Sequence, residues 1–169
     1  MTLYVALDGP DGCGKSSQAQ ALAEWLRARC GEVLHVREPG STPVGEALRE
    51  LLLAKTTGVL RPISEALLFS AARAELVQRV IAPALRRGAI VIAERCYLST
   101  WVYQGLAACD APPEPAGDGV PEPVDTEWLW QTTRLVHGAW LPDLVLVLDV
   151  ATEVAAARRG ARGDDRIEA

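Results

Sequence analysis

A glycine-rich segment near the start of the chain has the residue types and the spacing of a phosphate-binding loop. It fits the pattern Gly-x4-Gly-Lys-[Ser/Thr] and consists of Gly9, Pro10, Asp11, Gly12, Cys13, Gly14, Lys15 and Ser16. Glycines allow backbone N–H groups to turn toward phosphate oxygens, and the helix expected to begin near Ser16 adds its positive N-terminal end. In this pattern the lysine reaches the β- and γ-phosphates, and the serine hydroxyl ligates Mg²⁺. The segment, extended to Ser17, therefore predicts a site for ATP and Mg²⁺.

Asp11 places a carboxylate inside this loop, facing the phosphates. That position is unfavourable beside phosphate unless the carboxylate binds magnesium, directly or through water, or helps to position the attacking oxygen. Two alternatives compete with the triphosphate site. One is a glycine-rich turn that only precedes a helix. The other is a Gly-x-Gly-x-x-Gly dinucleotide loop, which is disfavoured because Ser17 stands where its third glycine belongs.

Glu94 and Arg95 come directly after an apolar run over residues 89–93 that we expect to be a strand. In open α/β sheets, ligands bind at the carboxyl ends of the strands. At that edge Arg95 is suited to bridge donor and acceptor phosphates, and Glu94 is suited to bind magnesium-coordinated water. An ordinary ion pair at a strand end is the alternative.

Arg37 and Glu38 stand in the same way at the end of a weaker apolar run, residues 32–37. Pro39 and Gly40 then turn the chain. A substrate-facing charged pair and a plain turn are equally compatible with this pattern.

Phe69 and Arg73 are four residues apart in a helical pattern and therefore share one face. An aromatic ring beside a guanidinium can stack on a base and hydrogen-bond its edge, but the spacing alone favours a core Phe and a surface Arg. Four polar residues after the third strand carry little weight by themselves: Ser99, Thr100, Tyr103 and Gln104.

Arginines and glycines alternate over residues 158–166, near the end of the chain, and include Arg158 and Arg162. Glycines give mobility and arginines bind phosphate, which are the properties of a lid that closes over a developing charge. A solvated C-terminal helix is the alternative.

The elements that must position these residues alternate along the chain. Nearly continuous Val, Ile and Leu runs predict strands covered on both faces, at 3–7, 89–93 and 144–148, with a weaker strand at 32–37. Helical periodicity or composition predicts helices at 16–30, 43–53, 64–85, 126–137 and 152–159. The third of these is expected to bend at Pro83. The alternation predicts one domain over residues 1–169, with a three-layer α/β/α fold and a central parallel sheet. A proline-rich surface loop is expected at 110–123.

Composition narrows the class of protein. The chain has 169 residues, a net charge of -5 and 49% apolar residues, and no apolar run reaches the roughly 20 residues of a membrane helix. The charge argues against coating nucleic acid. Residues 1–7 lack the features of a secretory signal, so we expect a cytoplasmic protein. The cysteines form no close pair, which argues against zinc knuckles and disulfides: Cys13, Cys30, Cys96 and Cys109.

These motifs, in this order, resemble those of the thymidylate kinases, a family of P-loop nucleoside monophosphate kinases. Beyond the phosphate loop, the resemblance rests on REPGSTPVGEALR (37–49), EALLFSAARAE (65–75), ERCYLSTWVYQG (94–105), PDLVLVLDV (142–150) and RRGARGDDRIE (158–168). It implies transfer of a phosphoryl group from ATP to dTMP, and a homodimer. A deoxynucleoside kinase, or a nucleotide-binding or dimerisation module with little catalytic activity, is the alternative.

The resemblance also implies roles for single residues. Phe69 would stack on thymine while Arg73 hydrogen-bonds its edge, which reverses the interpretation from spacing, and Gln104 would also meet the base. Tyr103 would lie under the deoxyribose. The acceptor phosphate would be held by Arg37, Arg49 and Arg95, in a pocket also lined by Glu38, Ser99 and Thr100. Because positions 10–13 hold no arginine, the bacterial type of the family is implied, in which a lid arginine, Arg158 or Arg162, joins Asp11, Lys15 and Arg95 in catalysis.

The chain departs from the family pattern in three places. Glu94 stands where an aspartate is usual. Ser41 replaces a commoner glycine, which is tolerable if its φ is negative. The sequence ends at Ala169, before the helix, strand and terminal helix that follow the lid in the family.

Overall fold

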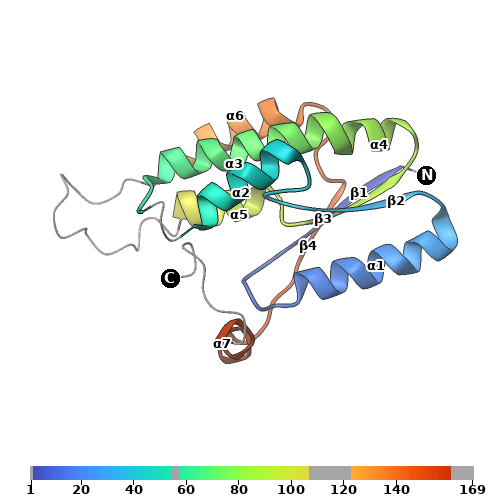
Figure 1. The fold of residues 1–169 in the computed structure, drawn as a ribbon, viewed down its shortest axis with the longest axis horizontal. Helices are drawn as coiled ribbons and strands as arrows, with labels where there is room; N and C mark the ends of the chain where they lie inside the picture. Colours follow the sequence, from blue (N-terminus) through green and yellow to red (C-terminus); the bar gives the residue numbers. More distant parts are fainter. Residues whose placement is uncertain (1, 55–57, 107–122, 161–169) are drawn as a thin grey trace.

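The computed structural model describes residues 2–54, 58–106 and 123–160, and it shows a parallel sheet between layers of helices (Figure 1). The four strands lie in the order β2-β3-β1-β4 and all pair in parallel. They span Leu3–Asp8 (β1), Val33–Arg37 (β2), Ile90–Glu94 (β3) and Leu144–Val147 (β4). The predicted fold class is confirmed, and every predicted strand is present with ends displaced by at most one residue.

Helices cover the two faces of this sheet unequally. In Figure 1, α1 lies on one face, and α3, α4 and α6 lie on the other. The helices span Lys15–Cys30 (α1), Pro43–Leu53 (α2), Pro62–Leu76 (α3), Ala82–Arg86 (α4), Tyr97–Thr100 (α5), Thr126–His137 (α6) and Thr152–Gly160 (α7). Among the described residues, no helix combines the length and the apolar character needed to cross a bilayer.

Alternate residues of β1 enter two separate cores, which explains its unbroken apolar sequence. Tyr4 and Ala6 pack in one core with side chains of α3 and α4, whereas Val5 and Leu7 pack in the other with Ala19 of α1 and its neighbours. All four strand residues are at most 3% exposed. The strand therefore needs apolar side chains on both faces.

β4 differs from this prediction of full coverage. It pairs with β1, and in the described part of the chain it is the edge strand. Leu144 is 47% exposed and Val147 is 64% exposed. The strand itself is correctly predicted, but its burial on both faces is not, because burial depends on which elements cover an edge.

The long helix predicted over 64–85 begins two residues earlier and contains a π-helical turn. Pro62 occupies the first turn of α3, where its missing N–H is not needed. The π-helical turn η2 (Val77–Ile81) joins α3 to α4, and Ala82 N–H donates to the Val77 carbonyl. This wider turn ends two residues before Pro83, which cannot donate a helical hydrogen bond. The bend expected at Pro83 thus takes the form of a change in helical type, and the chain continues as helix.

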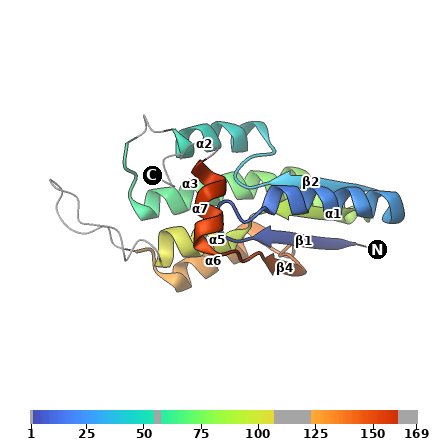
Figure 2. The same cartoon turned by 90° about the horizontal axis from the view of Figure 1, so that it is seen from below.

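The sheet brings the predicted functional segments to one edge. Leu7 of β1 and Arg37 of β2 both align with Glu94 of β3. The connection from β1 leads to one side of the sheet and the connection from β3 leads to the other, so a crevice opens between these two strands. Figure 2 shows α7 beside the N-terminal end of α1, which begins at that crevice.

Candidate active site

The phosphate loop runs from the end of β1 into α1, which begins at Lys15, one residue earlier than expected. Gly14 precedes the helix with a φ of 99°, a value that L-residues with side chains rarely adopt. The side chain of Lys15 is 8% exposed, and its ammonium donates to the carbonyl oxygens of Gly9 and Pro10, both at 2.8 Å. It lies 3.4 Å from a carboxylate oxygen of Asp11. The ammonium is therefore held within the loop by oxygen atoms of the loop itself.

Two glycines of this loop are required by close backbone approaches. A Cβ on Gly9 would lie 2.3 Å from the carbonyl oxygen of Leu148, just after β4. A Cβ on Gly12 would lie 2.5 Å from the carbonyl oxygen of Ala155 in α7. Both separations are far below van der Waals contact, so the loop can lie against β4 and α7 only without side chains at these positions.

The two residues predicted to hold magnesium meet across the crevice. The Ser16 hydroxyl donates to Glu94 Oε2 at 2.5 Å, and Glu94 Oε1 lies 2.8 Å from His35 Nε2. The Nδ1 atom of His35 is in turn 3.0 Å from Gln20 Oε1. Hydroxyl and carboxylate oxygens are ligands that Mg²⁺ accepts, usually together with waters and substrate phosphates. The described residues contain no cluster of three or more His, Cys, Asp or Glu side chains that could enclose a metal. The pair therefore fits an ion that shares its coordination with a nucleotide.

Arg95 faces the phosphate loop from the other side. Its guanidinium pairs with Asp11, and its Nη1 donates to the Ser99 hydroxyl at 2.8 Å. The hydroxyl of Tyr103 also donates to Asp11, at 3.3 Å. Burial lowers the pKa of Arg95, but the charges of Asp11, Tyr103 and Asp8 together raise it by more. The pKa of Arg95 therefore lies above its usual value. Arg95 is thus a permanently charged group between the loop and the cavity beyond it.

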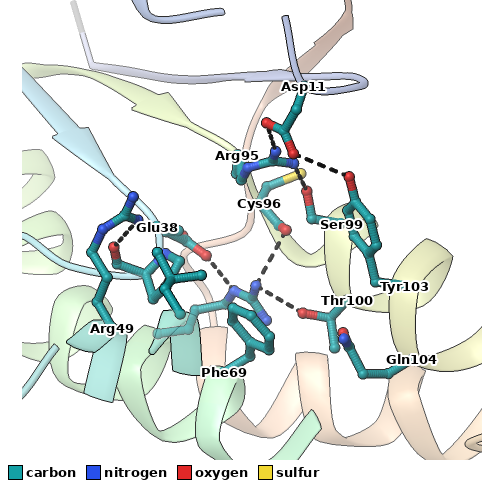
Figure 3. A pocket seen from close by; sticks show the side chains of 13 residues that line it. Asp11, Glu38, Arg49, Phe69, Arg95, Cys96, Ser99, Thr100, Tyr103 and Gln104 are labelled. Carbon is teal, nitrogen blue, oxygen red and sulfur yellow. Dashed lines mark hydrogen bonds and ion pairs between the residues drawn. The ribbon is translucent and has the colours of Figure 1, made fainter. Parts of the chain in front are cut away.

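That cavity encloses about 630 Å³ of space between protein atoms, counting its open mouth. Figure 3 shows side chains from the phosphate loop, α3, α5 and the segment after α5 converging on it. Its wall contains every residue predicted to bind the acceptor except Arg37, and consists of Asp11, Glu38, Pro39, Arg49, Leu53, Phe69, Arg73, Arg95, Cys96, Ser99, Thr100, Tyr103 and Gln104.

A buried ion pair forms part of the cavity wall. Arg73 Nε donates to Glu38 Oε2 at 2.5 Å, and both residues are 4% exposed. The Nη2 atom of Arg73 donates to the carbonyl of Cys96 and to the hydroxyl of Thr100, at 3.2 and 3.1 Å. Burial raises the pKa of Glu38, while Arg73 counteracts that rise. The core-Phe and surface-Arg alternative is therefore wrong for Arg73, which is buried and lines a cavity.

Comparisons with known proteins agree with this arrangement. The profile of the thymidylate kinase family matches residues 7–111. A thymidylate kinase of Symbiobacterium thermophilum is 41% identical over 168 residues, which cover 99% of this chain and 72% of the relative. One of Thermomicrobium roseum is 45% identical, over 95% of this chain and 69% of the relative. The chain belongs to the thymidylate kinase family.

A solved structure of a family member shows the same fold. The crystal structure of the thymidylate kinase from Ehrlichia chaffeensis superposes with a TM-score of 0.74 at 32% identity. The match covers 92% of this chain and 75% of that one. The resemblance found from the sequence motifs is thereby confirmed at the level of the family and of the fold.

The base-binding residues expected in the thymidylate kinase family lie at one end of the cavity. Phe69 and Arg73 both line the cavity, and Figure 3 shows the ring of Phe69 on the same side of it as Gln104. Gln104 is 1% exposed, and its amide nitrogen donates to Glu65 at 2.9 Å. Its amide oxygen has no hydrogen-bond partner. Tyr103 and Gln104 belong to a π-helical turn, η3 (Trp101–Leu106), a geometry frequent at functional sites.

The two remaining arginines expected at the acceptor phosphate of this family are placed differently. Arg49 lines the cavity, and its Nη1 donates to the carbonyl of Pro39 at 3.1 Å. Arg37 does not line the cavity. Its half-exposed guanidinium pairs with Glu46 at 2.8 Å, so this structure does not bring it together with Arg95.

Ser41 corrects an expectation about the same loop. Its φ is 62°, in the left-handed region, whereas we expected a negative φ for a serine replacing glycine. The conformation is held by hydrogen bonds, because the Ser41 hydroxyl accepts from Arg37 N–H at 2.9 Å and Ser41 N–H donates to Glu46 at 2.7 Å. The peptide bond between Glu38 and Pro39 is cis.

The predicted lid is described only at its start. Arg158, in α7, donates to the carbonyl of Gly12 in the phosphate loop at 3.1 Å. Arg162 lies outside the described residues, as do Cys109 and nearly all of the proline-rich loop 110–123. The cysteines that are described have no disulfide bond: Cys13, Cys30 and Cys96.

Two polar residues of this site in the thymidylate kinase family member, Asp8 and His35, were not predicted from the sequence. Asp8 is 4% exposed and accepts hydrogen bonds from both Gly9 and Ser99. His35 contacts Glu94 from the neighbouring strand. A carboxylate at the end of an apolar strand was a possible signal for Asp8. The sequence contains no comparable signal for His35, because its role depends on the register of β2 beside β3.

Proposed function

We propose that this protein transfers the γ-phosphoryl group of ATP to dTMP, with Mg²⁺, giving dTDP and ADP. The observation that carries the proposal is Asp11, which belongs to the phosphate loop and also lines the acceptor cavity. Donor and acceptor sites therefore share a wall, as a direct transfer between two nucleotides requires. The reaction needs no covalent enzyme intermediate, because in-line attack depends on positioning and on charge neutralisation.

On the donor side, the phosphate loop would hold ATP through its backbone N–H groups and Lys15. Ser16 and Glu94 are the residues suited to Mg²⁺, since their oxygens are 2.5 Å apart. Magnesium, when bound, would offset the negative charge of the phosphate oxygens. Ser17 extends the start of α1, where the positive helix end favours phosphate.

On the acceptor side, Arg95 and Arg49 would hold the phosphate of dTMP. Phe69 would stack on the base, while Arg73 would donate to its edge. Gln104 supports this assignment, since its buried amide oxygen has no partner and can accept an N–H from a base. Tyr103 would lie under the sugar, and Glu38, Ser99 and Thr100 would complete the wall.

For the lid, we propose that Arg158 or Arg162 supplies the charge that the phosphate loop lacks. Arg158 already donates to the loop at Gly12, so a short movement of its side chain would bring it to a bound triphosphate. Replacing each arginine by alanine in turn is expected to lower kcat by at least tenfold for one of the two. Equal wild-type rates in both variants would contradict the assignment.

The test of the function is an ADP-release assay with four acceptors: dTMP, dCMP, dGMP and dAMP. We expect a preference for dTMP of at least about tenfold, and a loss of at least about a hundredfold in Lys15→Met. Phosphorylation of thymidine but not of dTMP would instead identify a deoxynucleoside kinase. Binding of ATP and dTMP without turnover would identify a binding module.

We further propose that the protein is a homodimer with no nucleic-acid or membrane partner, in the cytoplasm. Ile63 and Leu67 share one face of α3 and are 44% and 51% exposed, which supports burial against a second copy. The net charge of -5 and the unbonded thiols suit a reducing compartment and a small-molecule substrate. Sedimentation equilibrium would test the dimer, and an Ile63→Asp variant is expected to be monomeric.

A further inference from the structure

Asp8, the last residue of β1, is a buried carboxylate surrounded by hydrogen-bond donors. Its Oδ1 accepts from Gly9 N–H at 2.9 Å and from the Ser99 hydroxyl at 2.7 Å. Its Oδ2 accepts from the N–H groups of Cys96 and Ser99, at 3.1 and 3.2 Å. The Cys96 thiol lies 3.4 Å from Oδ2 as well. A carboxylate is buried at a large cost unless such donors replace water, and here both oxygens are saturated.

These donors come from the two segments that form the reaction centre. Gly9 opens the phosphate loop, whereas Cys96 and Ser99 belong to the turn and short helix that follow β3. Asp8 therefore ties the donor loop to the segment that carries Arg95. The Nη1 atom of Arg95 lies 3.7 Å from Asp8 Oδ1, so the two charges form an ion pair without a direct hydrogen bond.

The backbone of Arg95 needs such support. Its φ is 72°, in the left-handed region that residues with side chains avoid. Hydrogen bonds hold the chain on both sides of this residue: Arg95 N–H donates to the Leu7 carbonyl at 2.8 Å, and the next N–H, of Cys96, donates to Asp8. The direction in which Arg95 leaves the strand is thus set by β1 and its terminal carboxylate.

The side chain of Arg95 is oriented through Ser99. A serine hydroxyl has one hydrogen, and that of Ser99 is given to Asp8. The hydroxyl oxygen consequently presents its lone pairs to Arg95, whose Nη1 donates to it at 2.8 Å. The other end of the guanidinium then meets Asp11 at the mouth of the phosphate loop.

We propose that Asp8 is a positioning residue for phosphoryl transfer: through the Ser99 hydroxyl and the Cys96 N–H it aims Arg95 at the point where donor and acceptor phosphates meet. The inference rests on the proposed function. It assigns Asp8 no contact with substrate, and its effect on the reaction passes through Arg95.

A purely structural role for Asp8 makes a different prediction from a positioning role. If Asp8 only stabilised the fold, its replacement would lower activity by the same factor whether or not Arg95 is present. If it acts through Arg95, its replacement should matter little once Arg95 has been removed. A double-mutant cycle separates the two cases.

The experiment compares wild type, Asp8→Asn, Arg95→Ala and the double variant, with kcat, KM and the Kd of dTMP from calorimetry. We expect Asp8→Asn to weaken dTMP binding and to lower kcat/KM by about tenfold or more. The amide NH2 group of the new side chain would face a hydrogen-bond donor, so at least one of the present hydrogen bonds would be lost. The KM of ATP should change less than twofold. In the Arg95→Ala background, Asp8→Asn should change the Kd of dTMP by less than twofold. An equal loss in both backgrounds, or wild-type behaviour of folded Asp8→Asn, would overturn the proposal.

Two further variants keep the test decisive. Ser99→Ala leaves Asp8 in place but removes the relay, so most of its effect on the Kd of dTMP should disappear in the Arg95→Ala background, even if Asp8→Asn fails to fold. Only the part that comes from its place in the cavity wall should remain. Asp143→Asn is the matched control, because Asp143 caps the opposite end of β1 by accepting from Tyr4 N–H at 2.8 Å. It should leave the kinetics of dTMP unchanged. Failure of the proposed function would be distinct from these outcomes, since wild-type protein would then not turn over dTMP at all.

Discussion

The Ser16 hydroxyl donates a hydrogen bond of 2.5 Å to Glu94, across 78 positions of sequence. Ser16 lies in the first turn of α1 and Glu94 ends β3, so this contact joins the phosphate loop to the neighbouring strand. Glu94 reaches this position although it is one methylene longer than the aspartate usual there. The Nε2 atom of His35 is 2.8 Å from its second oxygen, so both ends of the carboxylate are engaged.

Glu94→Gln is expected to raise the Mg²⁺ concentration needed for half-maximal activity by about tenfold, because an amide lacks the charge that attracts the ion. The measurement is the rate as a function of free Mg²⁺ at saturating ATP and dTMP. Glu32→Gln serves as the control, since Glu32 pairs with Arg87 in an exposed contact. A Mg²⁺ dependence shared by wild type and Glu94→Gln would contradict the metal assignment.

Replacing only one member of the buried pair of Arg73 and Glu38 should lower the free energy of unfolding more than replacing both. Arg73→Met leaves an unpaired buried carboxylate, so we expect the free energy of unfolding to fall by about 3–5 kcal/mol. Adding Glu38→Gln should recover about half of that loss. Urea denaturation measures both, and additive losses in the double variant would show that the two side chains are not coupled.

Because the backbone of Ser41 is left-handed, two small substitutions at this position should differ in their effect on stability. Ser41→Ala keeps the unfavourable φ and loses the hydroxyl that accepts from Arg37 N–H, so we expect a loss of about 1 kcal/mol. Ser41→Gly loses the same hydroxyl but relieves the backbone, and its stability should stay within about 0.5 kcal/mol of wild type. Thermal denaturation of the two variants side by side tests this, and the reverse order would count against the left-handed conformation.

His137 should make the protein sensitive to acid. Burial and, to a lesser extent, the charge of Arg73 together lower its pKa from 6.5 to about 4. A histidine whose pKa is lower in the folded state contributes stability above pH 6.5, and this stability is lost as pH falls toward 4. Relative to His137→Phe, the wild-type free energy of unfolding should fall by up to about 3 kcal/mol over that window. Between pH 7 and 9 the two curves should run parallel, and parallel curves down to pH 4 would refute the shift.

Much of the fold could be predicted because its signals are local. The unbroken apolar runs at 3–7 and 89–93 reflect strands with two covered faces, and α2 and α6 begin and end at the predicted residues. The π-helical turn inside the helix predicted at 64–85 could not be predicted, because a single turn is too short to leave a periodic pattern in the sequence.

Site residues that belong to a continuous motif could be predicted from the sequence. Residues whose role depends on contacts with distant segments could be predicted less well. From spacing alone Arg73 had the character of a surface residue, since nothing local indicates Glu38 as its partner 35 positions away. Arg37 shares the motif of Glu38, but its side chain points to Glu46 and away from the cavity. Adjacent residues at the end of a strand, such as Arg37 and Glu38, point to opposite faces of the sheet. Only the packing of α2 decides which of the two side chains reaches the cavity.

The sequence by itself determined the phosphate loop, the parallel sheet and the family, because glycine spacing, apolar runs and family motifs are properties of continuous segments. Only the tertiary structure decided that Asp8 is saturated by donors near residue 96, that Ser41 is left-handed, and that β4 has exposed side chains. Each of these depends on the free energy of contacts between segments far apart in the chain, which no local pattern of residues records.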